Sequence, residues 1–154
     1  LARLHTTANS GQSDPDLAEL DAMLARIQND LFDLGADLCT PETGEKLEWE
    51  PLRIVDAQVS RLEGEIDRLN ADLTPLRSFV LPGGTPAAAH LHLARTIIRR
   101  AERLMVELSM TPEETVSEPA LKYANRVSDF LFVASRWANG KGSDEVLWVA
   151  GQNR

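Results

Sequence analysis

The chain has 154 residues, of which 43% are hydrophobic, and this is enough apolar material for one globular domain with its own core. Its formal net charge is −8 and its pI is about 4.9, which excludes nucleic acid or an anionic membrane as the main binding partner, because both require a basic surface. A single cysteine, Cys39, and the lack of any apolar run near the roughly 20 residues that span a bilayer exclude a disulfide framework and a membrane span, and they favour a cytoplasmic protein.

Four segments place apolar residues at alternating steps of three and four, which is the spacing of one face of an α-helix. The predicted helices cover residues 17–38, 52–73, 91–108 and 123–137. Proline is common at the first position of a helix. The prolines that precede the four patterns are Pro15, Pro51, Pro86 and Pro112, and the predicted caps before them are Asp14, Thr85 and Thr111. No strand pattern of comparable length competes, so the sequence predicts an all-α bundle.

The connecting segments differ in character. Residues 10–15 and 39–51 are polar and rich in turn formers, whereas SFVLPGGTP (78–86) is an apolar run with a glycine pair. EVLWVA (145–150) is a short apolar tail that could dock as a strand or as an extended arm, and residues 1–7 look like the end of a helix. The PGG of this loop lacks the lysine and hydroxyl residue of a phosphate-binding Walker loop, so it indicates a turn before a capped helix.

The histidines give little support to a metal site. His90 and His92 lie two residues apart, which directs them to different sides of a helix, and no cysteine or HExxH pattern accompanies them. We interpret both as structural residues or as residues at the rim of a site.

ARTIIRRAER (94–103) carries a row of arginines inside an apolar helical pattern. The residues that share one face of this helix are Arg95, Arg99, Glu102 and Arg103, and Ala94, Ile98 and Ala101 fall on another face. Two interpretations stay open. The row is either a solvated face in which Glu102 and Glu107 are ion-pair partners, or a polyphosphate clamp, since guanidinium groups present planar donor forks to phosphate oxygens.

KYANRVSDFLF (122–132) places Asn125 and Asp129 four residues apart on a helix whose other faces are apolar. Both side chains are therefore expected to be partly buried or to face a cleft, where polar groups need partners. Alternatively, Asp129 forms a structural ion pair with an arginine of the neighbouring helix. The two interpretations are compatible, because an ion pair can orient an arginine for a ligand.

SFVLPGG (78–84), ARTIIRRAER and ALKYANRVSDFLFVASRWAN (120–139), in this order, resemble the PduO-type ATP:cob(I)alamin adenosyltransferases over nearly the whole chain. The resemblance implies a five-helix bundle of ferritin-like up-and-down arrangement that forms a homotrimer, with active sites at subunit interfaces. It also implies transfer of the 5′-deoxyadenosyl group of ATP to Co(I) of cobalamin by direct attack on the ribose C5′ carbon, with release of triphosphate. ATP, Mg²⁺ and cobalamin are then expected, and no general base is needed.

The same resemblance assigns the site residues. Those expected to bind ATP are Arg95, Arg99, Arg100, Glu102, Arg103 and Asn125. Phe79 and Val80 are expected to bind cobalamin, and Phe79 lies against the lower face of the corrin, where it excludes the lower axial ligand. This favours four-coordinate Co(II), which is easier to reduce to the Co(I) nucleophile. Phe79, Arg95 and Arg99 are thus the expected catalytic residues, Arg95 also braces the subunit interface, and no metal is held by protein side chains alone.

The sequence departs from the family pattern at its start. Family members carry a TGDxGxT segment, a lysine that wraps the phosphates and a DELN stretch, and none of these precedes Leu1. We therefore expect a single adenosyltransferase domain over residues 1–154 that lacks the N-terminal ATP-binding loop and has a truncated first helix. The alternative function is a non-catalytic trimeric module that binds a corrinoid and delivers adenosylcobalamin to a mutase.

Overall fold

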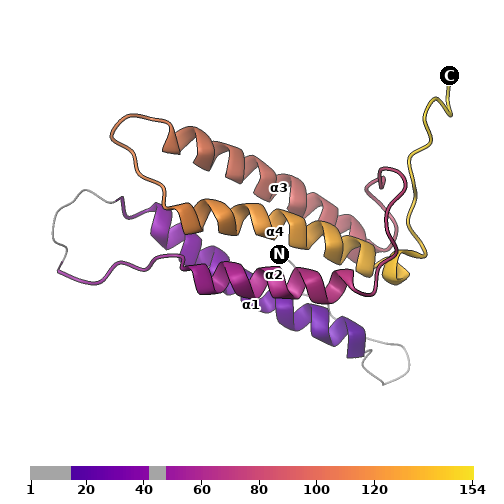
Figure 1. The fold of residues 1–154 in the computed structure, drawn as a ribbon, viewed down its shortest axis with the longest axis horizontal. Coiled ribbons are helices and arrows are strands. Elements are labelled where there is room, and N and C mark those ends of the chain that lie inside the picture. The colour runs from indigo at the N-terminus through magenta and orange to yellow at the C-terminus, as the bar shows by residue number, and fades with distance from the viewer. Residues whose placement is uncertain (1–14, 42–47) are drawn as a thin grey trace.

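The computed structural model describes residues 15–41 and 48–154, which form an all-α bundle, as predicted (Figure 1). The helices are α1 (Pro15–Leu38), α2 (Asp56–Asn70), α3 (Pro86–Ser109) and α4 (Glu118–Trp137), and the short 3-10 helix η1 (Gly140–Gly142) follows α4. Successive helices run in opposite directions along the bundle (Figure 1). The predicted truncated helix and the predicted cap Asp14 lie outside the described residues.

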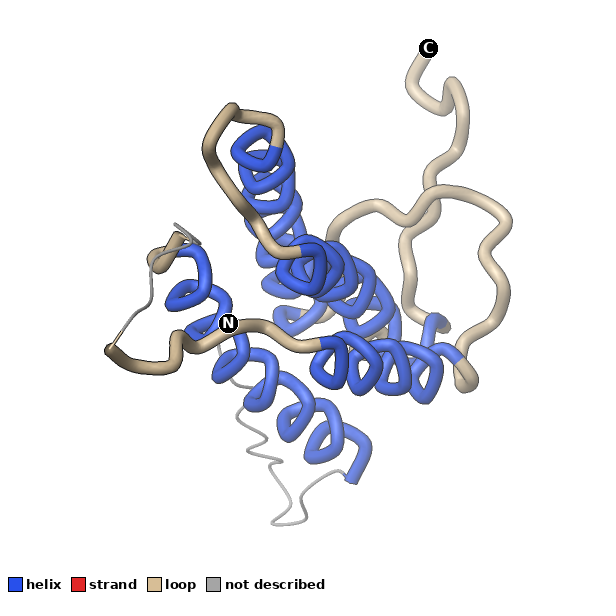
Figure 2. Tube along the Cα trace, turned by 60° about the vertical axis from the view of Figure 1, so that its left-hand side comes forward, coloured by secondary structure: helices blue, strands red, loops and turns tan. Residues whose placement is uncertain are grey.

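Helix α4 is the centre of the core. It packs against the three other helices, and α2 and α3 lie on either side of it (Figures 1 and 2). Its buried residues include Tyr123, Val127, Phe130 and Leu131, each at most 1% exposed. A buried phenylalanine contributes about 3–5 kcal/mol of stability relative to alanine, so α4 fixes the positions of the helices around it.

The predicted start of α3 is correct. Thr85 has an extended backbone, its Oγ1 accepts a hydrogen bond from the Ala88 N–H (3.2 Å), and Pro86 follows in the first turn. Both the cap and the proline are local features, since a threonine oxygen satisfies an N–H that has no partner within the helix and proline has none to satisfy.

The predicted start of α2 at Pro51 is wrong, because the helix begins at Asp56. Asp37, near the end of α1, accepts hydrogen bonds from the Arg53 side chain (2.7 Å) and from the Ile54 N–H (2.9 Å). These contacts hold the preceding segment extended. Val55 is the last extended residue, and its N–H donates to the Gln58 side chain (3.0 Å), which closes the start of the helix.

The predicted start of α4 at Pro112 is also wrong, because the helix begins at Glu118. Ser117 is the cap, and its Oγ accepts from the Ala120 N–H (3.3 Å). Glu113 has a φ of 71°, which a helix does not tolerate, so the chain cannot continue as a helix from Pro112. Thr111 is not a cap, since its hydroxyl donates to the Glu107 carbonyl of α3 (3.2 Å).

A buried polar network joins α1, α2 and α4. The Tyr123 hydroxyl donates to Asp30 (2.6 Å), which also pairs with Arg61, while Arg26 of α1 pairs with Glu65 of α2 (2.6 Å). Burial, together with the hydrogen bond to Asp30, raises the pKa of Tyr123, so the hydroxyl stays protonated and continues to donate. The network sets how α1 sits on the rest of the bundle.

Tyr123→Phe is expected to lower the free energy of unfolding by about 1.5–3 kcal/mol, because it removes a hydrogen bond to a buried carboxylate and leaves the packing of the ring unchanged. Urea unfolding followed by circular dichroism measures the loss. A variant as stable as the parent would mean that Arg61 and Gln58, whose side-chain amide also donates to Asp30 (3.1 Å), satisfy this carboxylate without the tyrosine.

Candidate functional site

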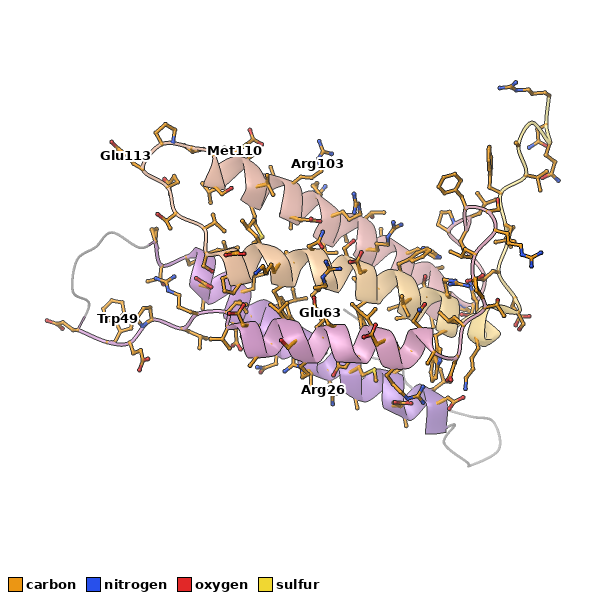
Figure 3. The ribbon with its side chains drawn as sticks, viewed as in Figure 1. Arg26, Trp49, Glu63, Arg103, Met110 and Glu113 are labelled. Atoms are coloured by element: carbon orange, nitrogen blue, oxygen red, sulfur yellow. The ribbon has the colours of Figure 1, made fainter. Side chains whose placement is uncertain are left out.

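The arginines of α3 border a shallow groove of about 360 Å³ on the surface of the helix. Its lining consists of Arg99, Glu102, Arg103, Val106, Glu107 and Met110, of which Arg103 and Met110 are labelled in Figure 3. Arg99 and Arg103 are exposed and lie one turn apart, because residues four positions apart on a helix are neighbours. Arg95 and Arg100 are outside this lining.

The arginines of the groove are available to an anion. Within residues 15–41 and 48–154, Arg99, Arg100 and Arg103 form no ion pair with a described carboxylate. Glu102, one of the carboxylates that could have neutralised them, instead accepts a hydrogen bond from the Asn125 side chain of α4 (2.7 Å). The structure therefore brings the predicted Glu102 and Asn125 together, and it argues against the interpretation of the row as a face of internal ion pairs.

Arg95 is held differently from the other arginines. Its guanidinium carbon lies 5.0 Å from the centre of the Phe132 ring of α4, a cation–π arrangement, and its side chain is half-buried. This contact fixes the side chain along the boundary between α3 and α4.

Asp129 does not pair with an arginine of α3. It pairs with Arg126, three positions earlier on α4, and Arg126 also lies 3.3 Å from Glu63 of α2, which is labelled in Figure 3. The Asp129 side chain is 47% exposed, so it is partly buried, as expected, but its partner does not come from the neighbouring helix. The i, i+3 spacing brings the two charges together within one helix without any help from a neighbour.

Phe79 lies on the loop of residues 74–84, which we call the Phe79 loop. Its side chain is 76% exposed, and its ring meets that of Trp148 edge to face, with centroids 5.9 Å apart. Residues 145–149, which we call the C-terminal arm, lie antiparallel to this loop (Figure 2). The Leu81 N–H donates to the Val146 carbonyl (2.8 Å), and the Trp148 N–H donates to the Phe79 carbonyl (2.8 Å). Val80 is half-buried opposite Leu147.

The PGG turn fixes the end of the Phe79 loop to the end of α4. Gly84 has a φ of +95°, and a Cβ at this position would lie 2.2 Å from the Asn139 side-chain oxygen. Asn139 is 1% exposed, donates to the Gly83 carbonyl (3.1 Å) and accepts from the Thr85 N–H (2.9 Å). Glycine is required here both for its backbone conformation and for the close approach of Asn139.

The sequence did not reveal two residues of this region, Arg136 and Asn139, whereas it did predict a docking tail that contains Trp148. Arg136 and Asn139 follow ordinary helical spacing, and only the folded chain places them against distant carbonyls. Trp148 carried a usable signal, because a large aromatic residue in a short apolar tail needs a surface to cover it.

The described residues contain no group of three or more histidine, cysteine, aspartate or glutamate side chains that could hold a metal ion. His90 is exposed, with its Nδ1 2.7 Å from the Pro86 carbonyl, and His92 is buried. Among the described residues, no helix is both long enough and apolar enough to cross a bilayer.

His92 makes stability depend on pH. Burial lowers its pKa from 6.5, and the Arg95 guanidinium lowers it further, against an opposing effect of Glu145. The unfolded chain therefore binds the proton first, so the contribution of His92 to stability is complete above its unfolded pKa and is lost progressively as the pH falls from that value through the lower folded pKa. In thermal melts between about pH 7.5 and pH 5.5, we expect His92→Leu to lose less stability than the parent as the pH falls. His90→Leu should lose as much stability as the parent. Equal pH slopes for the parent and His92→Leu would contradict this.

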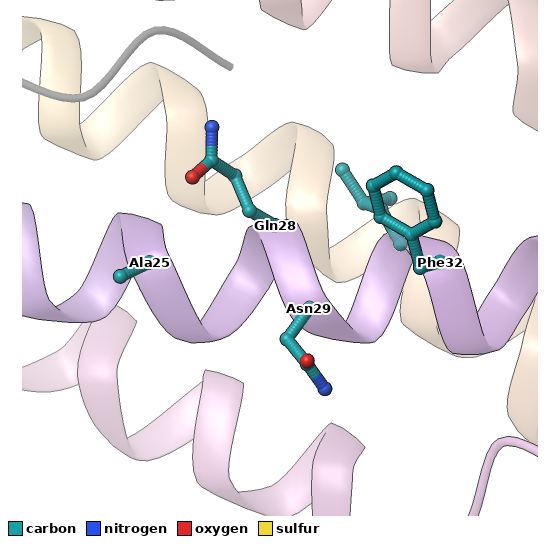
Figure 4. A pocket seen from close by; sticks show the side chains of 5 residues that line it. Ala25, Gln28, Asn29 and Phe32 are labelled. Carbon is teal, nitrogen blue, oxygen red and sulfur yellow. The ribbon is translucent and has the colours of Figure 1, made fainter.

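A second pocket, of about 470 Å³, lies on the outer face of α1 (Figure 4). It is lined by Ala25, Gln28, Asn29, Leu31 and Phe32, and the Phe32 side chain is 84% exposed. None of these described lining residues is titratable, so they supply neither an acid, nor a base, nor a charge for an anionic ligand.

The arginine groove and the Phe79 loop occupy different parts of one chain. The loop enters α3 at Pro86, and Arg99 lies thirteen residues further along this helix, a rise of roughly 20 Å. Figure 3 shows Arg103 well along α3, away from the end at which the loop and the arm meet. The exposed arginines of the groove and the exposed ring of Phe79 therefore lie on separate parts of the described chain.

Comparison with known proteins gives these surfaces a context. The family model described as cobalamin adenosyltransferase matches residues 2–138. A corrinoid adenosyltransferase of Mycobacterium tuberculosis (strain H37Rv) is 50% identical over 140 residues, which are 91% of this chain and 70% of that protein. A cobalamin adenosyltransferase of Cupriavidus metallidurans is 45% identical over 139 residues, which are 88% and 70% of the two chains.

The fold agrees with the sequence match. A solved structure of a variant PduO-type ATP:corrinoid adenosyltransferase from Lactobacillus reuteri, complexed with cobalamin and ATP, is similar with a TM-score of 0.75 and 36% identity, and the similarity covers 93% of this chain and 75% of that chain. The matched residues include the Phe79 loop and the arginines of α3, which are the motifs that carry the resemblance to the family. This chain therefore belongs to the cobalamin adenosyltransferase family.

Proposed function

We propose that this protein transfers the 5′-deoxyadenosyl group of ATP to Co(I) of cobalamin, which gives adenosylcobalamin and triphosphate. The observation that carries the proposal is that Arg99, Arg100 and Arg103 of α3 have no carboxylate partner among the described residues, in a chain of this family, because guanidinium groups suit the oxygens of a triphosphate. Co(I) attacks the C5′ carbon directly, so the protein supplies binding, orientation and charge neutralisation rather than a base.

For ATP we propose the residues Arg95, Arg99, Arg100, Glu102, Arg103 and Asn125. Arg99 and Arg103 border the groove and suit the phosphates, whose leaving triphosphate they neutralise. Glu102 is oriented by Asn125 and offers an acceptor beside these donors. Mg²⁺ would be held mainly by the phosphate oxygens, as is common for this ion, since the described residues provide no carboxylate cluster for it.

For cobalamin we propose Phe79 and Val80. A phenylalanine that served only the core would be buried, whereas Phe79 is 76% exposed on a loop whose backbone is braced by the C-terminal arm. An exposed, braced ring suits a flat apolar ligand. We propose that it takes the place of the lower axial ligand of the corrinoid and so favours four-coordinate Co(II).

We also propose a homotrimer with sites at the subunit interfaces. Leu93, Ile97 and Leu104 of α3 are between 51% and 59% exposed, and burial between subunits would remove them from water. The arginine groove and the Phe79 loop of one chain lie far apart along α3. In the trimer, the groove of one subunit therefore faces the Phe79 loop of another. A cytoplasmic location and delivery of the product to an adenosylcobalamin-dependent mutase complete the proposal.

Light scattering at micromolar concentration is expected to return three times the chain mass of 17.0 kDa. Ile97→Asp should shift the mass toward the monomer, because it places a charge in the buried interface, while Leu52→Asp, a matched change at an exposed leucine outside α3, should not. A monomeric parent would contradict the assembly.

The activity itself is tested by incubating Co(II)alamin with ATP and a strong reductant and recording the visible spectrum of the adenosylated product. Product formation supports the enzyme. Corrinoid binding without product would favour the alternative, a non-catalytic module that carries adenosylcobalamin.

A further inference from the structure

The Phe79 loop and the C-terminal arm meet at the end of α4, although they are more than 60 positions apart in the sequence (Figures 1 and 2). The middle of the loop bonds to the arm. Ser78 donates through its hydroxyl to the Trp148 carbonyl (2.6 Å), and two backbone hydrogen bonds follow at Phe79 and Leu81. The position of Phe79 therefore depends on the arm.

Arg136 on α4 connects both segments. Its Nε donates to Glu145, the first residue of the arm (2.6 Å), and its Nη2 donates to the other oxygen of Glu145 (3.4 Å) and to the Thr74 carbonyl, at the start of the Phe79 loop (2.7 Å). One guanidinium group thus holds the start of the loop and the start of the arm. The Arg136 and Glu145 side chains are 5% and 6% exposed.

A buried ion pair at the surface end of a bundle calls for a reason, because apolar residues of similar size would hold a core at least as well. Apolar contacts, however, are not directional, whereas the hydrogen bonds of an ion pair are. The fork of Arg136 fits the two Glu145 oxygens, which sets the direction in which the arm leaves η1. The turn between them is also specific, since Gly140 and Gly142 adopt positive φ values of 59° and 90°.

We propose that Arg136 and Glu145 are positioning residues for the corrinoid half of the reaction. Their ion pair holds the C-terminal arm against the Phe79 loop, so that the Phe79 ring is presented at a fixed place. Neither residue touches the arginine groove, so ATP binding is independent of the pair. This inference rests on the proposed role of Phe79 in forming four-coordinate Co(II).

The experiment compares Glu145→Ala with Val59→Ala in the full chain. Val59 is 6% exposed and lies near the start of α2, at the other end of the bundle, so its truncation lowers stability without touching the arm. Hydrogen exchange of the Leu81 and Trp148 amides reads the pairing of loop and arm directly. In Glu145→Ala both amides should exchange about 10- to 150-fold faster than in the parent, the change that corresponds to losing a hydrogen bond between charged groups. In Val59→Ala they should exchange only as fast as its lower stability requires.

The second readout is the chemistry. With ATP bound, Glu145→Ala should lose four-coordinate Co(II), seen by electron paramagnetic resonance, and adenosylation from Co(II) should fall on the order of 10-fold, while the Kd for ATP stays within about twofold of the parent. Glu145→Gln keeps an acceptor for Arg136, so its amide exchange and its adenosylation rate should lie between those of the parent and those of Glu145→Ala. It replaces Glu145→Ala if that variant does not fold.

Unchanged exchange at Leu81 and Trp148 would overturn the inference, and so would faster exchange with normal four-coordinate Co(II). A variant that lost both ATP binding and adenosylation would overturn the inference as well, because the substitution would then have disturbed the whole fold rather than the corrinoid half of the site. If the parent itself formed no adenosylcobalamin, the proposed function would fail, and the exchange measurement would still decide whether the ion pair holds the arm.

Discussion

Phe79→Ala is expected to abolish most adenosylation from Co(II) while the protein stays folded and still binds ATP. The side chain is 76% exposed and its described ring contact is with Trp148, so truncation should cost less than about 1.5 kcal/mol of stability. A buried phenylalanine would cost about 3–5 kcal/mol. The two values are far enough apart to be separated by a melt.

The effect on chemistry should be much larger than the effect on stability. When the ring lies against the corrin, the ligand buries it. This burial contributes about 3–5 kcal/mol, and that free energy opposes the binding of a lower axial ligand to cobalt. The fraction of four-coordinate Co(II) is expected to fall by more than about 100-fold, and the rate from Co(II) with it. Adenosylation of Co(I) prepared in advance should be much less affected, since that species has already lost the ligand.

Phe32→Ala is the matched control. Phe32 is 84% exposed on α1, so the same atoms are removed from a ring that is even more exposed and that no proposed role involves. Circular dichroism melts, ATP titration and the magnetic-resonance signal of Co(II) are measured on one preparation of each variant. A Phe79→Ala protein that melts far below the parent, or one that forms four-coordinate Co(II) normally, would remove Phe79 from the mechanism.

Arg99→Ala is expected to weaken ATP binding or turnover by roughly 10- to 150-fold, because it removes one charged hydrogen-bond donor from the phosphates, a loss of about 1.5–3 kcal/mol. The helix should remain intact, since alanine is the better helix former and Arg99 is exposed. Arg99→Lys should give an intermediate value, because lysine keeps the charge but not the planar fork.

Arg68→Ala serves as the control for the loss of one exposed arginine. Arg68 lies on α2 and pairs with Glu19 (3.0 Å) and Asp72 (3.2 Å), contacts that contribute little at a surface. Isothermal titration with ATP at two salt concentrations separates a specific contact from a change in net charge, which is equal in the two variants. Normal ATP binding by Arg99→Ala would return the arginine row to the interpretation of a solvated face.

Much of the fold could be predicted from the sequence because it depends on local features. Helical spacing of apolar residues is a property of each segment, and it placed all four helices. The start of α3 is likewise local, since Thr85 and Pro86 act within one turn. The arginine face of α3 and its separation from the apolar face both follow from helix geometry and residue spacing, so both could be predicted from the sequence.

The starts of α2 and α4 required the tertiary structure. Pro51 and Pro112 are as suitable for a helix start as Pro86, but a distant residue decides the start of α2 and the backbone conformation of the folded chain decides the start of α4. Asp37 holds the chain extended before α2, and the backbone at Glu113 turns away before α4. A local sequence signal indicates which backbone conformations a segment can adopt. A hydrogen bond from a distant residue can then select one of them.

The site shows the same division. Which side chains carry positive charge and which loop is apolar were readable in the sequence, because they depend on residue type and order. Only the folded chain decided that Glu102 bonds Asn125 rather than an arginine, and that Asp129 pairs within its own helix. It also decided that Arg136 joins the start of the Phe79 loop to Glu145. Each of these partners is chosen by distance and direction in space, which a spacing along the chain does not contain.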